Sequence, residues 1–246
     1  MARQECKYLV PFEKKEELLN DLKQYLVHDY YSDVKESKEY TVRSIYLDTH
    51  ALTTYYEKLA GIKVRNKFRI RGYNDYADDS IVFTEIKRKE NNFISKDRAM
   101  LPYSELDDFL KNGDTTKIVN HTVEYERKLR SAKNFLFYLS RDKLVPIINV
   151  VYEREAFECK FGSGLRVTMD MNIRSSLTSS FDNLFSEVDT GIIFPSHFIL
   201  EVKFNKVLPS WVPGIINKYY LIKESLSKYT LCISWHLKHR VLYHTI

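Results

Sequence analysis

The sequence predicts a mainly β fold of the α+β class, in which helices pack outside an antiparallel sheet. Aromatic residues make up 14% of the chain, with 18 Tyr and 14 Phe, and such side chains pack well on a pleated sheet. Several segments alternate charged and apolar residues at period two, which is the period of a β-strand. The 246 residues, 44% of them hydrophobic, can bury a sizeable core and predict a single domain over residues 1–246.

Net charge and cysteine content narrow the class of protein. The net charge of +5 is mildly basic and too weak to indicate a nucleic-acid partner, so none is expected. The three cysteines are far apart and form no C-x-x-C pair, which predicts neither a zinc ribbon nor a disulfide framework and favours a reducing compartment. The first residues are charged, and no apolar stretch approaches the ~20 residues needed to cross a bilayer. We expect a soluble, cytoplasmic protein with no transmembrane segment; a membrane partner, if there is one, is not encoded in this sequence.

The N-terminal strands and helices are predicted from the spacing of charged and apolar residues and from a glycine that ends a helix. Residues 3–10 alternate charged side chains and predict a strand. The spacing of Leu18, Leu19, Leu22 and Leu26 predicts a helix over 13–27. A strand is expected at 40–48 and a helix at 49–61, which Gly61 ends.

The middle of the chain predicts three consecutive strands and two helices. The strands are expected at 62–73, 80–89 and 92–101, joined by turns rich in Asn and Asp. A short acidic helix is expected at 104–111. The spacing of Leu129, Ala132, Leu136 and Leu139 predicts a longer helix over 122–140.

The C-terminal part returns to strands. Strands are expected at 147–159 and 164–174, joined by the Gly-rich turn at 161–164. The polar stretch 175–190 is interpreted as a loop, and a strand is expected at 197–205. Short helices complete the assignment at 209–228.

The segment from Lys63 to Arg71 carries the most distinctive pattern. As a strand it places cations on one face at 63, 65, 67, 69 and 71, and it places Ile62, Val64, Phe68 and Ile70 on the other. A cationic face of this kind either meets water, with surface pairing to carboxylates such as Asp78 and Asp79, or lines a cavity that holds an anion. Lys63 and Arg65, at the start of the strand, fit a solvated entrance as well as a binding site.

Similar alternation in six other predicted strands favours the second interpretation. If helices cover the apolar face, the charged faces lie together on one side, and curling the sheet into a barrel turns that side into a lumen. A lumen dense in cations needs a polyanion and some carboxylates to balance it. The pattern therefore favours a polyphosphate-type ligand, with carboxylates that are able to hold a divalent metal. For Glu85 we favour a salt bridge with the surrounding lysines.

Eight short motifs, in order, point to a known family. They resemble the VTC domain, the polyphosphate polymerase domain of the vacuolar transporter chaperone complex, which belongs to the triphosphate tunnel metalloenzymes, also called CYTH-like proteins. The motifs are Val42–Thr49, Lys67–Tyr73, Glu85–Lys89, Lys96–Ala99, Tyr152–Phe157, Leu165–Asp170, Ile199–Phe204 and Ser227–Tyr229.

The resemblance implies an eight-stranded antiparallel β-barrel tunnel that threads a phosphate chain, and transfer of the γ-phosphate of ATP to a growing polyphosphate. It implies a divalent metal, with Mn²⁺ as the first choice and Mg²⁺ as the second. The residues implied are catalytic Arg69, Arg71, Lys87 and Lys228, phosphate-binding Lys7, Lys67, Lys96, Arg98, Arg154, Arg166 and Lys203, and metal-binding Glu201 and Glu5.

Two departures from the family pattern bear on this expectation. The superfamily opens with Glu-x-Glu-x-Lys, whereas this chain has Arg3-Gln4-Glu5-Cys6-Lys7, so one carboxylate available for a second metal is replaced. The regulatory domain and membrane region of the eukaryotic VTC proteins are also absent from this sequence. Two other functions stay open: an inorganic triphosphatase or polyphosphate hydrolase of the same fold, and a non-catalytic polyphosphate-binding module.

Overall fold

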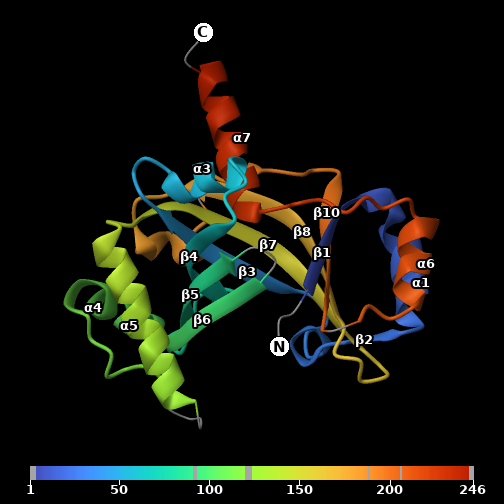
Figure 1. Ribbon diagram of the computed structural model, residues 1–246, viewed down its shortest axis with the longest axis horizontal. Helices are drawn as coiled ribbons and strands as arrows, with labels where there is room; N and C mark the ends of the chain where they lie inside the picture. The colour runs from blue at the N-terminus through green and yellow to red at the C-terminus, as the bar shows by residue number, and fades with distance from the viewer. Residues whose placement is uncertain (1–3, 91–92, 120–123, 188, 206, 244–246) are drawn as a thin grey trace. The chain divides into compact units, whose positions relative to one another are not determined.

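The structure is a computed structural model that describes residues 4–90, 93–119, 124–187, 189–205 and 207–243 (Figure 1). Arg3 and the predicted turn at Asn91 and Asn92 lie outside the described residues, as do positions 122 and 123 of the predicted helix. The chain divides into two compact units. Unit 1 comprises residues 1–41, 152–174 and 192–227, and unit 2 comprises 42–151, 175–191 and 228–246.

The strands confirm the predicted fold class, a mainly β fold with antiparallel pairing. Their order is β1-β10-β8-β7-β3-β4-β5-β6, with β2 paired to β7 and β9 paired to β8. The pairings β1–β10, β10–β8, β3–β4, β4–β5 and β5–β6 are all antiparallel. Strands β7 and β8 contribute residues to both units, and the single domain over 1–246 stays a prediction. The strand bounds are β1 Gln4–Pro11, β2 Leu26–His28, β3 Tyr40–Asp48, β4 Val64–Tyr73, β5 Ile81–Glu90, β6 Phe93–Pro102, β7 Val145–Cys159, β8 Arg166–Leu177, β9 Gly191–Ile192 and β10 His197–Phe204.

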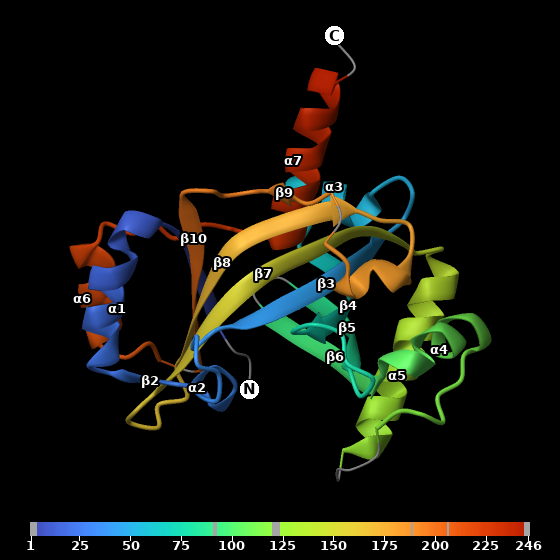
Figure 2. The same ribbon diagram turned by 180° about the vertical axis from the view of Figure 1, so that it is seen from behind.

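Unit 1 is built around one apolar core under two helices. Helices α1 (Lys15–Lys23) and α6 (Trp211–Lys218) lie side by side in both views (Figures 1 and 2). Leu18 and Leu22 of α1 join the apolar residues of β1, β8 and β10 in this core. The predicted helix 13–27 is too long at its C-terminal end, because Leu26 belongs to β2 and pairs with Cys159 of β7.

Unit 2 has its own core, on the apolar face of β4, β5 and β6. Helices α4 (Leu106–Asn112) and α5 (Tyr125–Arg141) belong to this unit, and α5 covers the sheet with Ala132 and Phe135. Phe68 and Ile70 are buried there, as the alternation predicts. Val64 lies on the same face of β4 as Phe68 and Ile70, as expected, but it is 64% exposed. Ile62 precedes the strand and is 46% exposed, and the core residues that β4 contributes are Phe68 and Ile70.

Close packing of a short 3-10 helix against β4 requires Gly72. A Cβ atom at this position would come within 2.9 Å of the Phe185 ring. That ring belongs to η3 (Phe181–Phe185), which lies in the stretch 175–190 that was interpreted as a loop. The interpretation is wrong in two respects, since β8 also continues to Leu177.

Two helices of unit 2 lie on the opposite, polar side of β3. Helix α3 (Thr53–Leu59) is the predicted helix 49–61, and α7 (Lys228–Tyr243) has no counterpart in the expectations above. The Tyr229 ring of α7 stacks on Tyr46 of β3, with 5.2 Å between ring centroids. The apolar residues of α7 are not confined to one face, since Leu231, Cys232 and Ile233 follow one another directly, which explains why the period did not reveal the helix.

The remaining short elements are α2 (Tyr30–Asp33), η1 (Phe12–Lys14) and η2 (Tyr103–Glu105). Among the helices of the described residues, none combines the length and the apolar character required to cross a bilayer.

The packing of α5 leads to a stability prediction. Replacing the buried Phe135 with Ala should lower the free energy of unfolding by about 3–5 kcal/mol, because it leaves a cavity in the unit 2 core. The matched control is Phe137→Ala on the same helix, at a side chain that is 58% exposed, and its loss should stay below about 1 kcal/mol. Urea unfolding measures both, and equal losses would contradict the packing described here.

Candidate functional site

The polar face of β3–β6 in unit 2 is organised in rows by the strand register. Tyr46, Arg69, Glu85 and Arg98 occupy one row across the four strands. Directly opposed residues of antiparallel strands point to the same side of the sheet, so these side chains share one face. The next row holds Lys67, Lys87 and Lys96, and the row beyond it holds Arg65 and Lys89.

A buried carboxylate, Glu85, holds the first row together. Its side chain is 1% exposed, and its Oε2 atom lies 2.6 Å from both Nε and Nη2 of Arg69. Arg98 Nε lies 3.2 Å from Oε1, and Lys96 forms an ion pair with the same oxygen. Burial alone would raise the pKa of Glu85, but the charges of Arg69, Arg71, Lys96 and Arg98 outweigh burial and hold it well below its usual range. We call Tyr46, Arg69, Glu85, Lys96 and Arg98 the Glu85 cluster.

The cations of this face also perturb one another. The pKa of Lys96 is lowered to about 7, first by burial and then by the charges of Arg69 and Arg98, against the attraction of Glu85. Burial would raise the pKa of the Tyr46 phenol, yet the charges of Arg69, Arg71 and Lys228 lower it on balance. The attraction of Glu85 therefore does not cancel the combined effect of burial and of the neighbouring cations on the pKa of Lys96.

The second row consists of three lysines, which we call the lysine row: Lys67, Lys87 and Lys96. Lys67 is opposite Lys87, and Lys87 is opposite Lys96. Like charges directly opposite one another on a sheet are destabilising. A multivalent anion above the row would reverse the sign of this contribution.

Lys228 is brought toward the same face by a buried hydrogen-bond network. Asp48, fully buried at the end of β3, accepts hydrogen bonds from the backbone amides of Thr54 (2.9 Å) and Tyr55 (3.0 Å) in α3. It also accepts one from the Tyr229 hydroxyl at 2.5 Å. One carboxylate thus fixes both the start of α3 and the start of α7, where Lys228 is the first residue. Arg71, also buried on this face, donates from Nε to Ser44 Oγ at 3.2 Å.

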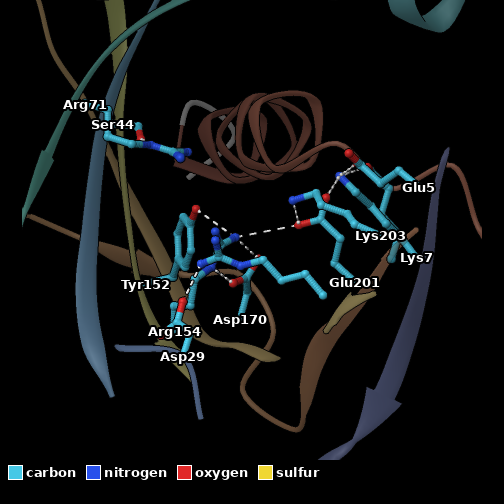
Figure 3. A network of polar contacts seen from close by, with 12 residues as sticks. Glu5, Lys7, Asp29, Ser44, Arg71, Tyr152, Arg154, Asp170, Glu201 and Lys203 are labelled. Atoms are coloured by element: carbon cyan, nitrogen blue, oxygen red, sulfur yellow. Dashed lines mark hydrogen bonds and ion pairs between the residues drawn. The ribbon is translucent and has the colours of Figure 1, made fainter. Parts of the chain in front are cut away.

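Unit 1 presents a different arrangement, which we call the Glu201 cluster: Glu5, Lys7, Arg154, Asp170, Glu201 and Lys203 (Figure 3). Its register alternates in charge, with Glu5 opposite Lys203 and Lys7 opposite Glu201. Lys7 Nζ lies 3.0 Å from Glu5 and 3.7 Å from Glu201, and Lys203 Nζ lies 3.0 Å from Glu201. Each cation of this cluster therefore has a carboxylate close by.

Arg154 forms the firmest ion pair of this cluster. Its Nε and Nη2 atoms reach the two oxygens of the fully buried Asp170 at 2.6 and 2.8 Å, a bidentate pair, and Nη2 lies 3.7 Å from Glu201 (Figure 3). Burial would lower the pKa of Arg154, but Asp170 raises it well above its usual value. Arg166 contacts Asp29 through Nη2, at 2.6 Å.

The two lysines of the Glu201 cluster differ in their titration. Burial alone would lower the pKa of Lys7, but the charges of Glu201 and Glu5 raise it on balance. The pKa of Lys203 is lowered to about 8, because burial and the charge of Arg154 outweigh the attraction of Glu201. Lys203 therefore loses its charge at a lower pH than Lys7 does.

The predicted metal ligands, Glu201 and Glu5, do come from neighbouring strands in one cluster, but they do not form a protein-only metal centre. Within the described residues no group of three His, Cys, Asp or Glu side chains could hold a metal ion. Both oxygens of Glu201 already face cations, Lys7 at one and Lys203 and Arg154 at the other. The donor set fits a divalent cation that is shared with phosphate oxygens, as Mg²⁺ is bound in many phosphoryl-transfer sites.

The predicted site residues therefore fall into two groups. Unit 2 holds Lys67, Arg69, Arg71, Lys87, Lys96, Arg98 and Lys228, and unit 1 holds Glu5, Lys7, Arg154, Arg166, Glu201 and Lys203. Glu85 forms the salt bridges expected of it, with Lys96 and two arginines. The pairing of Arg69 with surface carboxylates such as Asp78 is not its arrangement here, since its partner is Glu85.

Sequence reasoning missed the groups that orient the cations. Asp48 could have been found from the sequence, because it directly precedes the helix predicted at 49–61, and an Asp at that position often caps a helix. Tyr46 and Asp170 had none, because their roles depend on a neighbouring strand whose register the sequence does not state.

The fold and the two clusters define an α+β domain whose sheet carries buried carboxylates among closely spaced cations. The chain belongs to the VTC domain family, since the sequence profile of that domain matches residues 2–236. A curated relative, "Vacuolar transporter chaperone complex subunit 4" of Schizosaccharomyces pombe, is 24% identical over 221 residues, which is 77% of this chain. The chain spans 30% of the length of that relative.

Solved structures with a similar course of the chain were also found. One is a protein from Pyrococcus horikoshii OT3, with a TM-score of 0.48 and 12% identity over 94% of this chain and 98% of the other. Another is described as a putative adenylate cyclase from Bacillus halodurans, with a TM-score of 0.48 and 14% identity over 92% of this chain and 96% of the other.

The Asp48 network leads to a second prediction. Tyr229→Phe keeps the ring stack on Tyr46 but removes the hydrogen bond to a buried carboxylate, so the free energy of unfolding should fall by about 1.5–3 kcal/mol. Tyr56→Phe, at a residue that is 56% exposed, is the matched control and should change it by less than about 0.5 kcal/mol. Chemical denaturation followed by circular dichroism measures both, and a loss for Tyr229→Phe no larger than the control's would refute the network.

Proposed function

We propose that this chain is a metal-dependent polyphosphate polymerase that transfers the γ-phosphate of ATP to a growing inorganic polyphosphate chain inside a basic tunnel. The lysine row supports this most directly: three cations opposed in register favour a multivalent anion, and a linear polyphosphate carries negative charges along its whole length. Membership of the VTC domain family and the name of the curated relative support the same class. The ligands would be ATP and polyphosphate, with no nucleic acid.

Catalysis on this proposal is electrostatic and positional. The oxygen of the acceptor's terminal phosphate attacks the γ-phosphorus, the bond from that phosphorus to the β–γ bridging oxygen breaks, and ADP leaves. Arg69 and Arg71 would grip the transferring group with their planar forks, and Lys87 and Lys228 would neutralise charge near it. The remaining cations, Lys7, Lys67, Lys96, Arg98, Arg154, Arg166 and Lys203, would bind the other phosphates.

A divalent metal, Mn²⁺ first and Mg²⁺ second, belongs to the same proposal. Glu201, with Glu5 beside Lys7, would hold it together with phosphate oxygens. Bound there, it would neutralise phosphate charge. The chain's own contribution is to hold the Glu201 carboxylate in place between Lys7, Arg154 and Lys203.

A cytoplasmic location and a place in a larger complex belong to the proposal as well. The curated relative is named as a subunit of a complex.

The direct test supplies purified protein with ATP and Mn²⁺ and resolves the products on a gel. Long polyphosphate is expected for the polymerase. Orthophosphate alone, with rapid consumption of tripolyphosphate, would instead identify a hydrolase. Tight binding without turnover would identify a binding module.

Variants connect this activity to the Glu85 cluster. Arg69→Ala and Arg71→Ala should each lower the rate of polyphosphate synthesis about 100-fold or more, since each removes a preorganised donor to the transferring group. The matched control is Arg127→Ala, at an arginine 73% exposed on α5, which should keep the wild-type rate. If both variants retain binding and activity, the assignment of this face to the phosphates is wrong.

The pH dependence of binding gives another prediction. Phosphate favours the charged ammonium, and the pKa of Lys96 is lowered to about 7, so affinity for tripolyphosphate should be highest below pH 7 and fall as pH rises toward 9. Isothermal titration calorimetry in buffers of different ionisation enthalpy should show proton uptake on binding at pH 7.5.

Lys96→Arg provides the control for this effect, because a guanidinium stays charged throughout the range. This variant should keep more of its affinity at pH 9 than the wild type and should show less proton uptake. An identical pH profile for the two proteins would rule out Lys96 as the titrating group.

A further inference from the structure

The cations of unit 2 extend beyond the residues assigned above. Arg65 of β4 and Lys89 of β5 are opposite each other in the register, one row beyond the lysine row. Rows on one face of a strand are about 7 Å apart, because two residues separate them. The polar face therefore carries, in sequence, the Arg69 row, the lysine row and the Arg65–Lys89 row.

A further cation reaches this end of the face from a helix. Lys58 lies in the last turn of α3, and its pKa is lowered by burial and by the charges of Arg65 and Lys89. Helix α3 packs against β4, which brings Lys58 toward Arg65 and Lys89. The carboxylate of Glu57, also in α3, interacts with Arg65, but its own pKa is raised by burial and by the charge of Asp48, so it compensates the three cations only in part.

These cations are accessible and are not committed to the core. Lys58, Arg65 and Lys89 are each partly exposed, and the adjoining Val64 is 64% exposed. Like charges that lie close together and are partly exposed gain from a ligand whose own charges repeat along its length. A polyanion that already covers the lysine row would reach them without a change of direction.

We infer that Lys58, Arg65 and Lys89 form a distal subsite for linear polyphosphate, over which the chain runs after it leaves the Glu85 cluster and the lysine row. This inference rests on the proposed function and adds a direction to it. The reacting end lies at Arg69, Arg71 and Lys228, and the far phosphates pass toward the start of β4. A short chain such as tripolyphosphate is held by the Glu85 cluster, whereas a chain of tens of phosphates engages both.

A comparison of ligand lengths tests the subsite without any need for turnover. The variant carries Lys58→Gln, Arg65→Gln and Lys89→Gln together, and titration calorimetry measures its affinity for tripolyphosphate and for a chain of tens of phosphates. Wild-type protein should prefer the long chain. In the variant the ratio of long-chain to tripolyphosphate affinity should fall about five- to tenfold, a size appropriate to three partly exposed charge contacts. Added salt should weaken this preference in the wild type more than in the variant.

The matched control removes three exposed cations from α4 and α5, which pack on the apolar side of the sheet: Lys111→Gln, Arg127→Gln and Lys133→Gln. Its net charge changes by the same amount, so a general field effect would lower the affinity ratio equally in both variants and would overturn the inference. The charge-preserving variant Lys58→Arg with Lys89→Arg should restore the wild-type ratio. This variant also separates loss of charge from misfolding.

The outcomes separate this inference from the proposed function. If wild-type protein binds neither ligand, the proposed function fails. If it binds both and the triple variant keeps the wild-type ratio, the function survives and the distal subsite is refuted. If the triple variant keeps that ratio but no longer binds vesicles of anionic lipid, the cations serve a membrane surface, and the subsite is refuted as well.

Discussion

The ion pairs of Glu85 are the interaction on which the cationic face depends. A buried carboxylate beside Arg69, Lys96 and Arg98 is tolerable only because several positive charges surround it, and those charges can lie so close together only because it is there. Removing either side of this balance would leave uncompensated charge in a poorly solvated place. The lysine row lies one step away along the strands, with like charges opposed in register. This close spacing of cations is what makes the face suited to a polyanion.

The two units treat charge in different ways. In the Glu201 cluster, cations and carboxylates alternate across β1 and β10, and Arg154 is locked by a bidentate pair to Asp170. In unit 2, one carboxylate serves several cations. Mutual ion pairs hold the side chains of the Glu201 cluster in fixed positions, whereas the closely spaced cations around Glu85 favour an anion.

Much of the fold could be predicted from the spacing of residue types alone. Charged and apolar residues that alternate indicate strands, and leucines three or four residues apart indicate helices. The errors have identifiable causes. Leu26 continues the helical spacing of Leu18 and Leu22 but pairs with β7, so a tertiary contact overrode the local pattern. Helix α7 escaped notice because its apolar residues are distributed around it. Ile62 and Val64 continue the apolar alternation but are exposed. A periodic pattern shows which face of a strand a residue occupies, but not how far along the strand that face is covered by the core.

The sequence by itself determined the cationic face, its strand, and the family to which the chain belongs, because these depend on residue types at short spacings. Tertiary structure decided which cations share a carboxylate. Arg69, Glu85 and Arg98 are far apart along the chain and meet only through the register of β4, β5 and β6. The same holds for Asp48, which binds Tyr229 across 181 positions of sequence and thereby fixes the start of the helix that carries Lys228. Local spacing encodes which side of a strand a residue occupies, whereas the residue opposite it is fixed only when the strands pair.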